Sequence, residues 1–197
     1  MQISTLLLLV PRADTETLVE TALAALESIQ SPKVLDLGTG SGAIALAIAK
    51  ERPDGEVIGT DVSDAALAVA IENAGGNKIE NVRFIQSDWY SDVPDAHFDL
   101  IAANPPYLSP DDPHLGRGDL RFEPQIALSA EEEGYADLNT IIAGATQYLG
   151  PDGKLILEHG FAQAEGVHKL LSRYGFTNIE LHHDLNDLPR CSIAEKL

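Results

Sequence analysis

Asn104-Pro105-Pro106-Tyr107 is the segment of this sequence whose residue types suggest chemistry most directly. Each proline fixes φ and removes a main-chain N–H, and Pro105 also favours an extended conformation at Asn104. The result is a stiff corner that presents the side-chain oxygen of Asn104 and two main-chain carbonyls beside an aromatic ring. Such a corner can hold both hydrogens of a planar NH₂ group and orient its nitrogen toward an electrophile. We therefore predict that Asn104, Pro105, Pro106 and Tyr107 form a catalytic site for chemistry at nitrogen.

A glycine-rich turn, residues 36–42 (DLGTGSG), lies between an apolar run and a helical pattern. Three glycines in five residues let a ligand approach the main chain, and they supply φ angles that other residues rarely adopt. The helix that follows offers free N–H groups and a partial positive charge, which suit a carboxylate or a phosphate. The turn alone fits either NAD or S-adenosylmethionine. The candidate cofactor-binding residues are Gly38, Thr39, Gly40, Ser41 and Gly42.

Asp61, Asp88 and Trp89 follow the next two expected strands. The carboxylate of Asp61 can accept hydrogen bonds from both hydroxyls of a ribose, although a helix N-cap is the other interpretation of this residue. Asp88 could accept from an adenine amino group, and Trp89 could pack on the adenine ring or in the core. A nucleoside cofactor is thus predicted here. The Asn104 corner favours a methyl donor over NAD, because hydride transfer has no use for a site that holds NH₂.

Helical and strand patterns alternate along the chain, and these elements must position the candidate residues. The alternation implies a mostly parallel α/β sheet with helices on both faces. Ligands bind such sheets at the carboxyl ends of the strands, near the point where strand order reverses. We expect the first helix to be capped by Asp14 or Thr15, and the third to end at Gly75-Gly76. The expected helices are 14–29, 43–51, 65–74, 137–148 and 162–173, and the expected strands are 34–37, 57–60, 82–85, 98–103, 154–158 (after a turn at 151–153), 176–182 and 191–195, the last two as an antiparallel hairpin.

The length of 197 residues fits one α/β domain. A net charge of −18 disfavours a direct nucleic-acid partner, because phosphate backbones are repelled. The single cysteine allows no disulfide within the chain. The apolar run 6–10, which we interpret as a buried strand or chain entry, is too short to span a membrane, so we expect a cytoplasmic protein. Residues 182–184 (HHD) predict no metal site, since neighbours on a strand point to opposite faces.

Together these segments resemble the bacterial protein-(glutamine-N5) methyltransferases that modify class I peptide chain release factors, the HemK/PrmC family. Asn-Pro-Pro-Tyr is shared with adenine N6-methyltransferases, so its combination with Pro-Arg-x-Asp-Thr-Glu and Arg-Phe-Glu-Pro makes the resemblance specific. It covers nearly all of 10–197 and includes 10–16 (VPRADTE), the glycine turn, 86–89 (QSDW), 104–107 (NPPY), 112–115 (DPHL), 121–124 (RFEP) and 157–160 (LEHG).

The resemblance implies a Rossmann-like class I methyltransferase fold over 1–197, with S-adenosylmethionine as cofactor and S-adenosylhomocysteine as product. It implies cofactor contacts at Gly38 to Gly42, Asp61, Trp89 and Asn104, and a release-factor glutamine, from a Gly-Gly-Gln motif, against Asn104 to Tyr107. Family members carry a helical domain before Pro-Arg-x-Asp-Thr-Glu, whereas ten residues precede Pro11 here, so we expect that domain to be missing. Two alternatives remain: an adenine N6-methyltransferase, which the charge disfavours, and a cofactor-binding domain without turnover.

Overall fold

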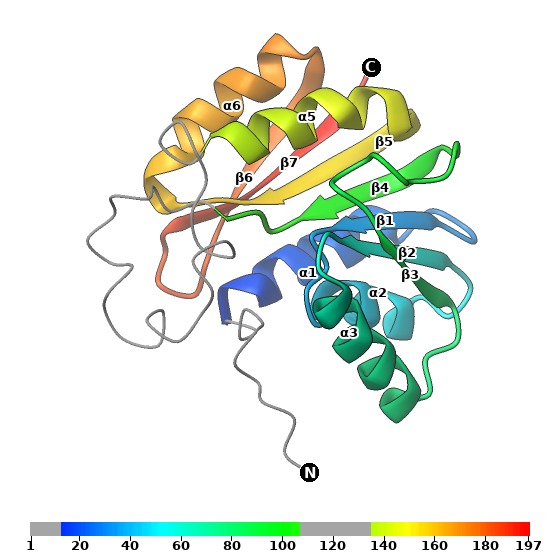
Figure 1. Ribbon diagram of the computed structural model, residues 1–197. Coiled ribbons are helices and arrows are strands. Elements are labelled where there is room, and N and C mark those ends of the chain that lie inside the picture. The colour runs from blue at the N-terminus through cyan, green and yellow to red at the C-terminus, as the bar shows by residue number, and fades with distance from the viewer. Residues whose placement is uncertain (1–12, 107–134) are drawn as a thin grey trace.

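Seven strands form one sheet in the computed structural model, which describes residues 13–106 and 135–197 (Figure 1). Their order is β3-β2-β1-β4-β5-β7-β6. The first five of these strands pair in parallel, and β7 pairs antiparallel with both β5 and β6. The predicted α/β fold with a C-terminal antiparallel hairpin is thereby confirmed. The strands are β1 (Lys33–Leu37), β2 (Glu56–Asp61), β3 (Val82–Gln86), β4 (Phe98–Ala103), β5 (Leu149–Glu158), β6 (Phe176–His183) and β7 (Pro189–Lys196).

Helices cover both faces of the sheet, as Figure 1 shows. Side chains alternate along β1, so Val34 packs toward α1 and α2 while Leu35 and Leu37 pack toward α5 and α6. Burial on both faces explains why the central strands are almost continuously apolar. One layer holds α1 (Ala13–Leu26), α2 (Ala43–Glu51) and α3 (Asp64–Asn77), and the other holds α5 (Ala136–Tyr148) and α6 (Ala164–Arg173), which the short 3₁₀ helix η4 (Phe161–Gln163) precedes.

Strand order reverses between β1 and β4, which are neighbours within the parallel part of the sheet. These strands are in register, with Leu37 opposite Ala103. The glycine turn begins directly after Leu37, and Asn104 directly after Ala103. The two candidate segments therefore leave the sheet side by side at its switch point, where α/β proteins bind ligands.

The third helix does not end at Gly75-Gly76, as the sequence suggested. It continues to Asn77 and ends where Lys78 adopts a left-handed conformation with φ 57°. The N–H of Ile79 then donates to the carbonyl of Ala74. A glycine inside a helix costs only about 1 kcal/mol relative to alanine, so packing overrides it. The left-handed residue, and not the glycine pair, is the stop signal.

Two other local expectations were wrong in their bounds. The turn at 151–153 lies inside β5, where the register with β4 shifts and Asp152 has φ 59°. Asp14 and Thr15 lie within α1, which begins at Ala13, so neither is its N-cap. The run 6–10 lies outside the described residues. None of the helices in 13–106 and 135–197 has the length and apolar character needed to cross a bilayer.

Candidate functional site

All three glycines of the turn adopt left-handed conformations, with φ 68° at Gly38, 57° at Gly40 and 84° at Gly42. Other residues rarely adopt such angles, which is the reason for glycine at each position. Gly42 is the residue before α2, and its carbonyl accepts the N–H of Leu46. The chain thus reverses sharply from β1 into the helix while exposing its main chain. A Cβ added at Gly40 would meet no atom within 4 Å, so the turn faces open space there.

Asp36 supports this turn from inside the protein. Its side chain is fully buried, and its Oδ2 accepts from the Thr39 hydroxyl at 2.6 Å and from the Ala45 N–H at 3.1 Å. One oxygen therefore ties the turn to the first turn of α2. Burial raises the pKa of Asp36 to about 7, against the lowering effect of its hydrogen bonds to Thr39 and Ala45. The carboxyl group shapes the turn and cannot itself reach solvent.

Asp61 fixes the turn from the neighbouring strand. Its Oδ2 accepts from the Gly40 N–H and its Oδ1 from the Ser63 N–H, both at 2.9 Å. The N-cap of α3 is Ser63, whose hydroxyl accepts from Ala66. The N-cap interpretation of Asp61 is therefore wrong. Its half-buried carboxylate lies beside the glycine turn at the end of β2.

Gly42→Ala is expected to lower the free energy of unfolding by roughly 1–3 kcal/mol. The new Cβ would lie 3.1 Å from Cβ of Ala70 and 3.2 Å from atoms of Leu46 and Phe84, at an unfavourable φ. The matched control is Gly75→Ala, where a Cβ inside α3 meets nothing within 4 Å. The control should gain roughly 0.5–1 kcal/mol. Urea unfolding of both variants checks this, and equal stabilities would refute the steric argument.

Asp88 and Trp89 extend from the loop after β3. The buried Ser87 fixes this loop, because its hydroxyl donates to the Trp89 carbonyl at 2.9 Å and accepts from the Asp92 N–H at 3.0 Å. Trp89 has φ 47°, and a Cβ added at Gly38 would lie 3.5 Å from its ring. The indole therefore lies against the start of the glycine turn, while Asp88 is exposed.

The corner after β4 contains a buried polar atom. Pro105 is buried and Pro106 half-buried, as expected for a stiff segment packed against the sheet. The side-chain oxygen of Asn104 is shielded from solvent and accepts no hydrogen bond from any described residue. Most buried acceptors in proteins are satisfied, so this oxygen is a candidate for contact with a ligand. Tyr107 lies outside the described residues.

The structure thus brings most of the predicted residues together at one edge of the sheet. Trp89 contacts Gly38, Asp61 bonds Gly40, and Asn104 leaves the sheet beside Gly38. Thr39 differs from the rest, because its hydroxyl points inward to Asp36 and its N–H donates to the Thr60 carbonyl at 2.7 Å. Its side chain is therefore occupied in shaping the turn.

The structure joins Thr15, which was expected only as a possible N-cap, to Glu158, for which no role was predicted. The Thr15 hydroxyl of α1 donates to Glu158 Oε2 at 3.1 Å, across 143 positions of sequence. Glu158 ends β5, one residue beyond the pairing of Ala103 with Leu157, so the bond lies next to Asn104 along the edge. Both residues belong to the motifs quoted for the family resemblance, but nothing in the local sequence of either one indicated that they would pair.

His159 is a buried residue with a structural role at the end of β5. Its Nδ1 lies 3.1 Å from the Gly160 carbonyl, which can only accept, so Nε2 accepts from the Ser192 hydroxyl at 2.8 Å. Burial lowers the pKa of His159, which favours the neutral ring. The imidazole therefore ties β5 to β7, and both of its ring nitrogens are engaged in these bonds.

Comparison with known proteins decides the family. Residues 13–115 match the family described as Methyltransferase small domain. The chain is 52% identical over 176 residues to a release factor glutamine methyltransferase of Salmonella typhimurium, covering 89% of this chain and 63% of that protein. It is 50% identical to one from Burkholderia pseudomallei, covering 93% of this chain and 67% of that protein. The chain belongs to the release factor glutamine methyltransferase family. It spans about two thirds of the length of these relatives.

A solved structure of the same family agrees with the fold. It is the release-factor-specific protein-(glutamine-N5) methyltransferase of Alicyclobacillus acidocaldarius, 27% identical to this chain with a TM-score of 0.57. The match covers 95% of this chain and 94% of that one. Family membership confirms the resemblance drawn from the motifs.

Proposed function

We propose that this chain transfers a methyl group from S-adenosylmethionine to the side-chain nitrogen (N5) of the glutamine in the Gly-Gly-Gln motif of class I release factors, leaving S-adenosylhomocysteine. The names of the relatives support the substrate, and the site supports the chemistry. The observation that carries the proposal is the shielded side-chain oxygen of Asn104, which no described residue satisfies. A glutamine NH₂ supplies the hydrogen that this oxygen lacks.

The glycine turn and its neighbours fit S-adenosylmethionine. The main chain of Gly38 to Gly42 is open at Gly40 and lies at the start of α2, which suits the carboxylate of the cofactor. Asp61 uses one lone pair of each oxygen on the protein and retains others for ribose hydroxyls. The Trp89 ring and the exposed Asp88 suit an adenine ring and its amino group. Bound there, the cofactor would supply a sulfonium methyl group, whose carbon bonds to the substrate nitrogen as its bond to sulfur breaks and S-adenosylhomocysteine leaves.

The protein's own part in the transfer is to orient and polarise the amide. Delocalisation makes an amide nitrogen a poor nucleophile, so a fixed geometry contributes more than a strong base. We propose that Asn104 Oδ1 accepts one hydrogen of the substrate NH₂ and that the Pro105 carbonyl accepts the other. Both acceptors stabilise the positive charge that grows on nitrogen before the methylated nitrogen releases a proton to solvent. Pro105 and Pro106 keep the corner stiff, and we propose that Tyr107 packs on the planar substrate amide.

We further propose that 1–197 acts as one catalytic domain in the cytoplasm, with release factors as its protein substrates. An adenine N6-methyltransferase is not favoured, because the relatives are named for methylation of release factor glutamine. The net charge of −18 also repels nucleic acid. The assay described next must also distinguish an active enzyme from a domain that binds the cofactor without turnover.

The test is methyl transfer from tritiated S-adenosylmethionine to a purified release factor, with duplex DNA as a parallel acceptor. We expect label on the release factor and none on a variant whose motif glutamine is replaced by alanine. Label on DNA would contradict the proposed substrate. Cofactor binding without label on any acceptor would contradict turnover itself.

A further inference from the structure

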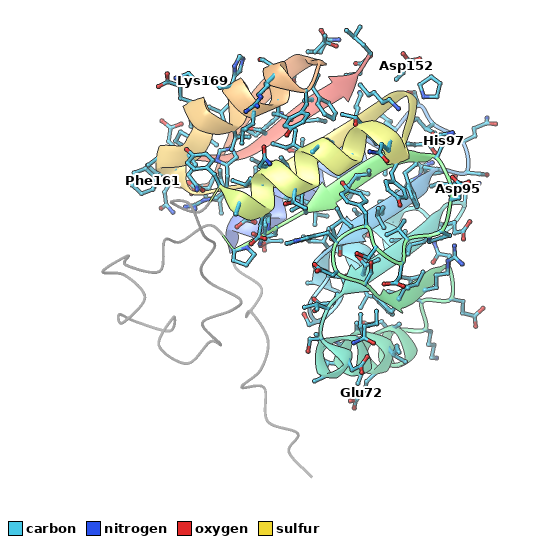
Figure 2. All side chains as sticks on the ribbon, turned by 45° about the horizontal axis from the view of Figure 1, so that its top comes forward. Glu72, Asp95, His97, Asp152, Phe161 and Lys169 are labelled. Atoms are coloured by element: carbon cyan, nitrogen blue, oxygen red, sulfur yellow. The ribbon has the colours of Figure 1, made fainter. Side chains whose placement is uncertain are left out.

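Three large apolar side chains are exposed in two adjoining segments after β5 and before β7. Phe161 is 59% exposed, Leu185 83% and Leu188 40%. Phe161 begins η4, and both leucines belong to the loop between β6 and β7. Figure 2 shows Phe161 on the outside of the ribbon at the start of α6. Single exposed apolar residues are ordinary, but a group of them at one edge marks an interaction surface.

The two segments are joined by hydrogen bonds. The His159 N–H donates to the Arg190 carbonyl at 2.9 Å, and Nε2 of His159 lies 2.8 Å from the Ser192 hydroxyl. Phe161 comes two residues after His159, and Leu188 two residues before Arg190. The loop and η4 are therefore held beside each other, and we call Phe161, Leu185 and Leu188 the apolar edge.

The loop that carries the leucines is fixed from within. The carboxylate of Asp184 accepts from the N–H groups of Asn186 at 2.8 Å and Leu188 at 3.1 Å. It also pairs with Arg190 at 3.2 Å, and only 1% of the Asp184 side chain is exposed. The Asp184 N–H closes the loop by donating to the Leu188 carbonyl at 2.9 Å. A loop pinned this firmly presents its leucines in a set geometry, which lowers the entropic cost of binding.

The apolar edge lies along the same end of the sheet as Asn104. β4 and β5 pair up to Ala103 and Leu157, after which one strand leads to Asn104 and the other to Phe161. A protein that brings a side chain to Asn104 must lay part of its surface over this end. The exposed Asp187 in the same loop and the net charge of −18 favour a partner with basic residues around an apolar contact.

We propose that Phe161, Leu185 and Leu188 dock the folded domain of the protein substrate that carries the target glutamine. This inference rests on the proposed function. The apolar edge contributes to recognition of the whole substrate and takes no part in the methyl transfer. The apolar edge therefore lowers KM for the intact protein substrate. A short peptide that reaches only Asn104 does not contact the apolar edge.

The experiment compares the double variant Phe161→Ser/Leu185→Ser with the control Ile71→Ser. Ile71 is also 59% exposed, but it lies on α3. Steady-state kinetics are measured with an intact release factor and with a short Gly-Gly-Gln peptide, together with the melting temperature and the Kd for S-adenosylhomocysteine. We expect KM for the intact protein to rise roughly tenfold in the double variant. Peptide turnover, cofactor Kd and melting temperature should stay at wild-type values, and the control should match wild type throughout.

An unchanged KM for the intact protein would overturn the proposal, and so would an equal loss of activity on the peptide. If the wild type modifies no substrate, the proposed function fails, and docking is then tested by direct binding. Fluorescence anisotropy with a labelled release factor, in the presence of S-adenosylhomocysteine, gives that Kd. Weaker binding by the double variant than by Ile71→Ser supports docking, and equal binding overturns it.

Discussion

Replacement of Asn104 by alanine is expected to lower kcat for methyl transfer by roughly 10²–10³-fold, with a much smaller change in cofactor affinity. The side-chain oxygen of Asn104 is the acceptor that we assign to the substrate amide. The positive charge on the amide nitrogen, which this oxygen stabilises, develops only as the methyl group arrives. Loss of such a group raises the barrier without weakening the ground state equally. The measurement is single-turnover kinetics with a release factor, alongside calorimetric binding of S-adenosylhomocysteine.

The stability of the same variant separates catalysis from structure. No described residue bonds Asn104 Oδ1, and a buried unsatisfied acceptor costs about 1–3 kcal/mol, so its removal should leave the free energy of unfolding unchanged or higher. The control Asn77→Ala removes an exposed side chain whose bond within the described residues goes to the Asn73 carbonyl, and it should alter neither rate nor binding. An unchanged kcat for Asn104→Ala would remove Asn104 from the mechanism. A parallel fall in cofactor affinity would make it a cofactor ligand alone.

Replacement of Asp36 by asparagine is expected to gain stability relative to the wild type as pH rises from 5 to 8. The native pKa of about 7 lies above the ordinary value of 3.8, mainly because the group is buried. Between these values the native state holds a proton that the unfolded state releases, so this stabilising contribution is complete below about pH 4 and is lost through pH 7. At roughly 1.4 kcal/mol per pH unit, the total is a few kcal/mol. Urea unfolding at several pH values measures it.

Asparagine suits this test because both hydrogen bonds of Asp36 use the same oxygen, Oδ2. An amide oxygen in that place keeps the bonds to Thr39 and Ala45 and removes the titration. The NH₂ group that replaces the buried Oδ1, which no described residue bonds, adds a cost that does not change with pH. The matched control is Asp54→Asn, since the bonds of Asp54 to Arg52 and Ser31 hold its pKa near 2, below the tested range. Its stability should run parallel to the wild type from pH 5 to 8. Parallel behaviour of Asp36→Asn as well would contradict a raised pKa at Asp36.

The sequence predicted best the elements that begin or end at a strong local signal. α2 and β4 have the expected bounds, because Gly42 starts one and Asn104-Pro105 ends the other. The misjudged places are those where tertiary contacts override local preference. α3 continues through its two glycines while packed on β2 and β3, and β5 keeps pairing with β4 on both sides of the turn at 151–153.

In the candidate site, the positions of the residues along the sheet edge could be predicted from the sequence, but the directions of their side chains could not. Gly40, Asp61, Trp89 and Asn104 could be placed together, because the carboxyl ends of neighbouring parallel strands share one edge. The direction of each side chain could not be predicted from spacing. The direction of the Thr39 hydroxyl depends on which face of the turn the buried Asp36 carboxylate occupies. Contacts between segments far apart in the sequence, such as α1 and the end of β5, leave no local pattern.

A crystal structure of this chain with S-adenosylhomocysteine and a peptide containing Gly-Gly-Gln would show directly whether Asn104 holds the substrate amide. We expect the glutamine side-chain nitrogen to lie about 2.7–3.2 Å from Asn104 Oδ1, with that nitrogen facing the sulfur of the cofactor product across the glycine turn. A complex in which Asn104 Oδ1 points away from the glutamine, or in which the nucleoside lies elsewhere than beside Gly38 to Gly42, would contradict it.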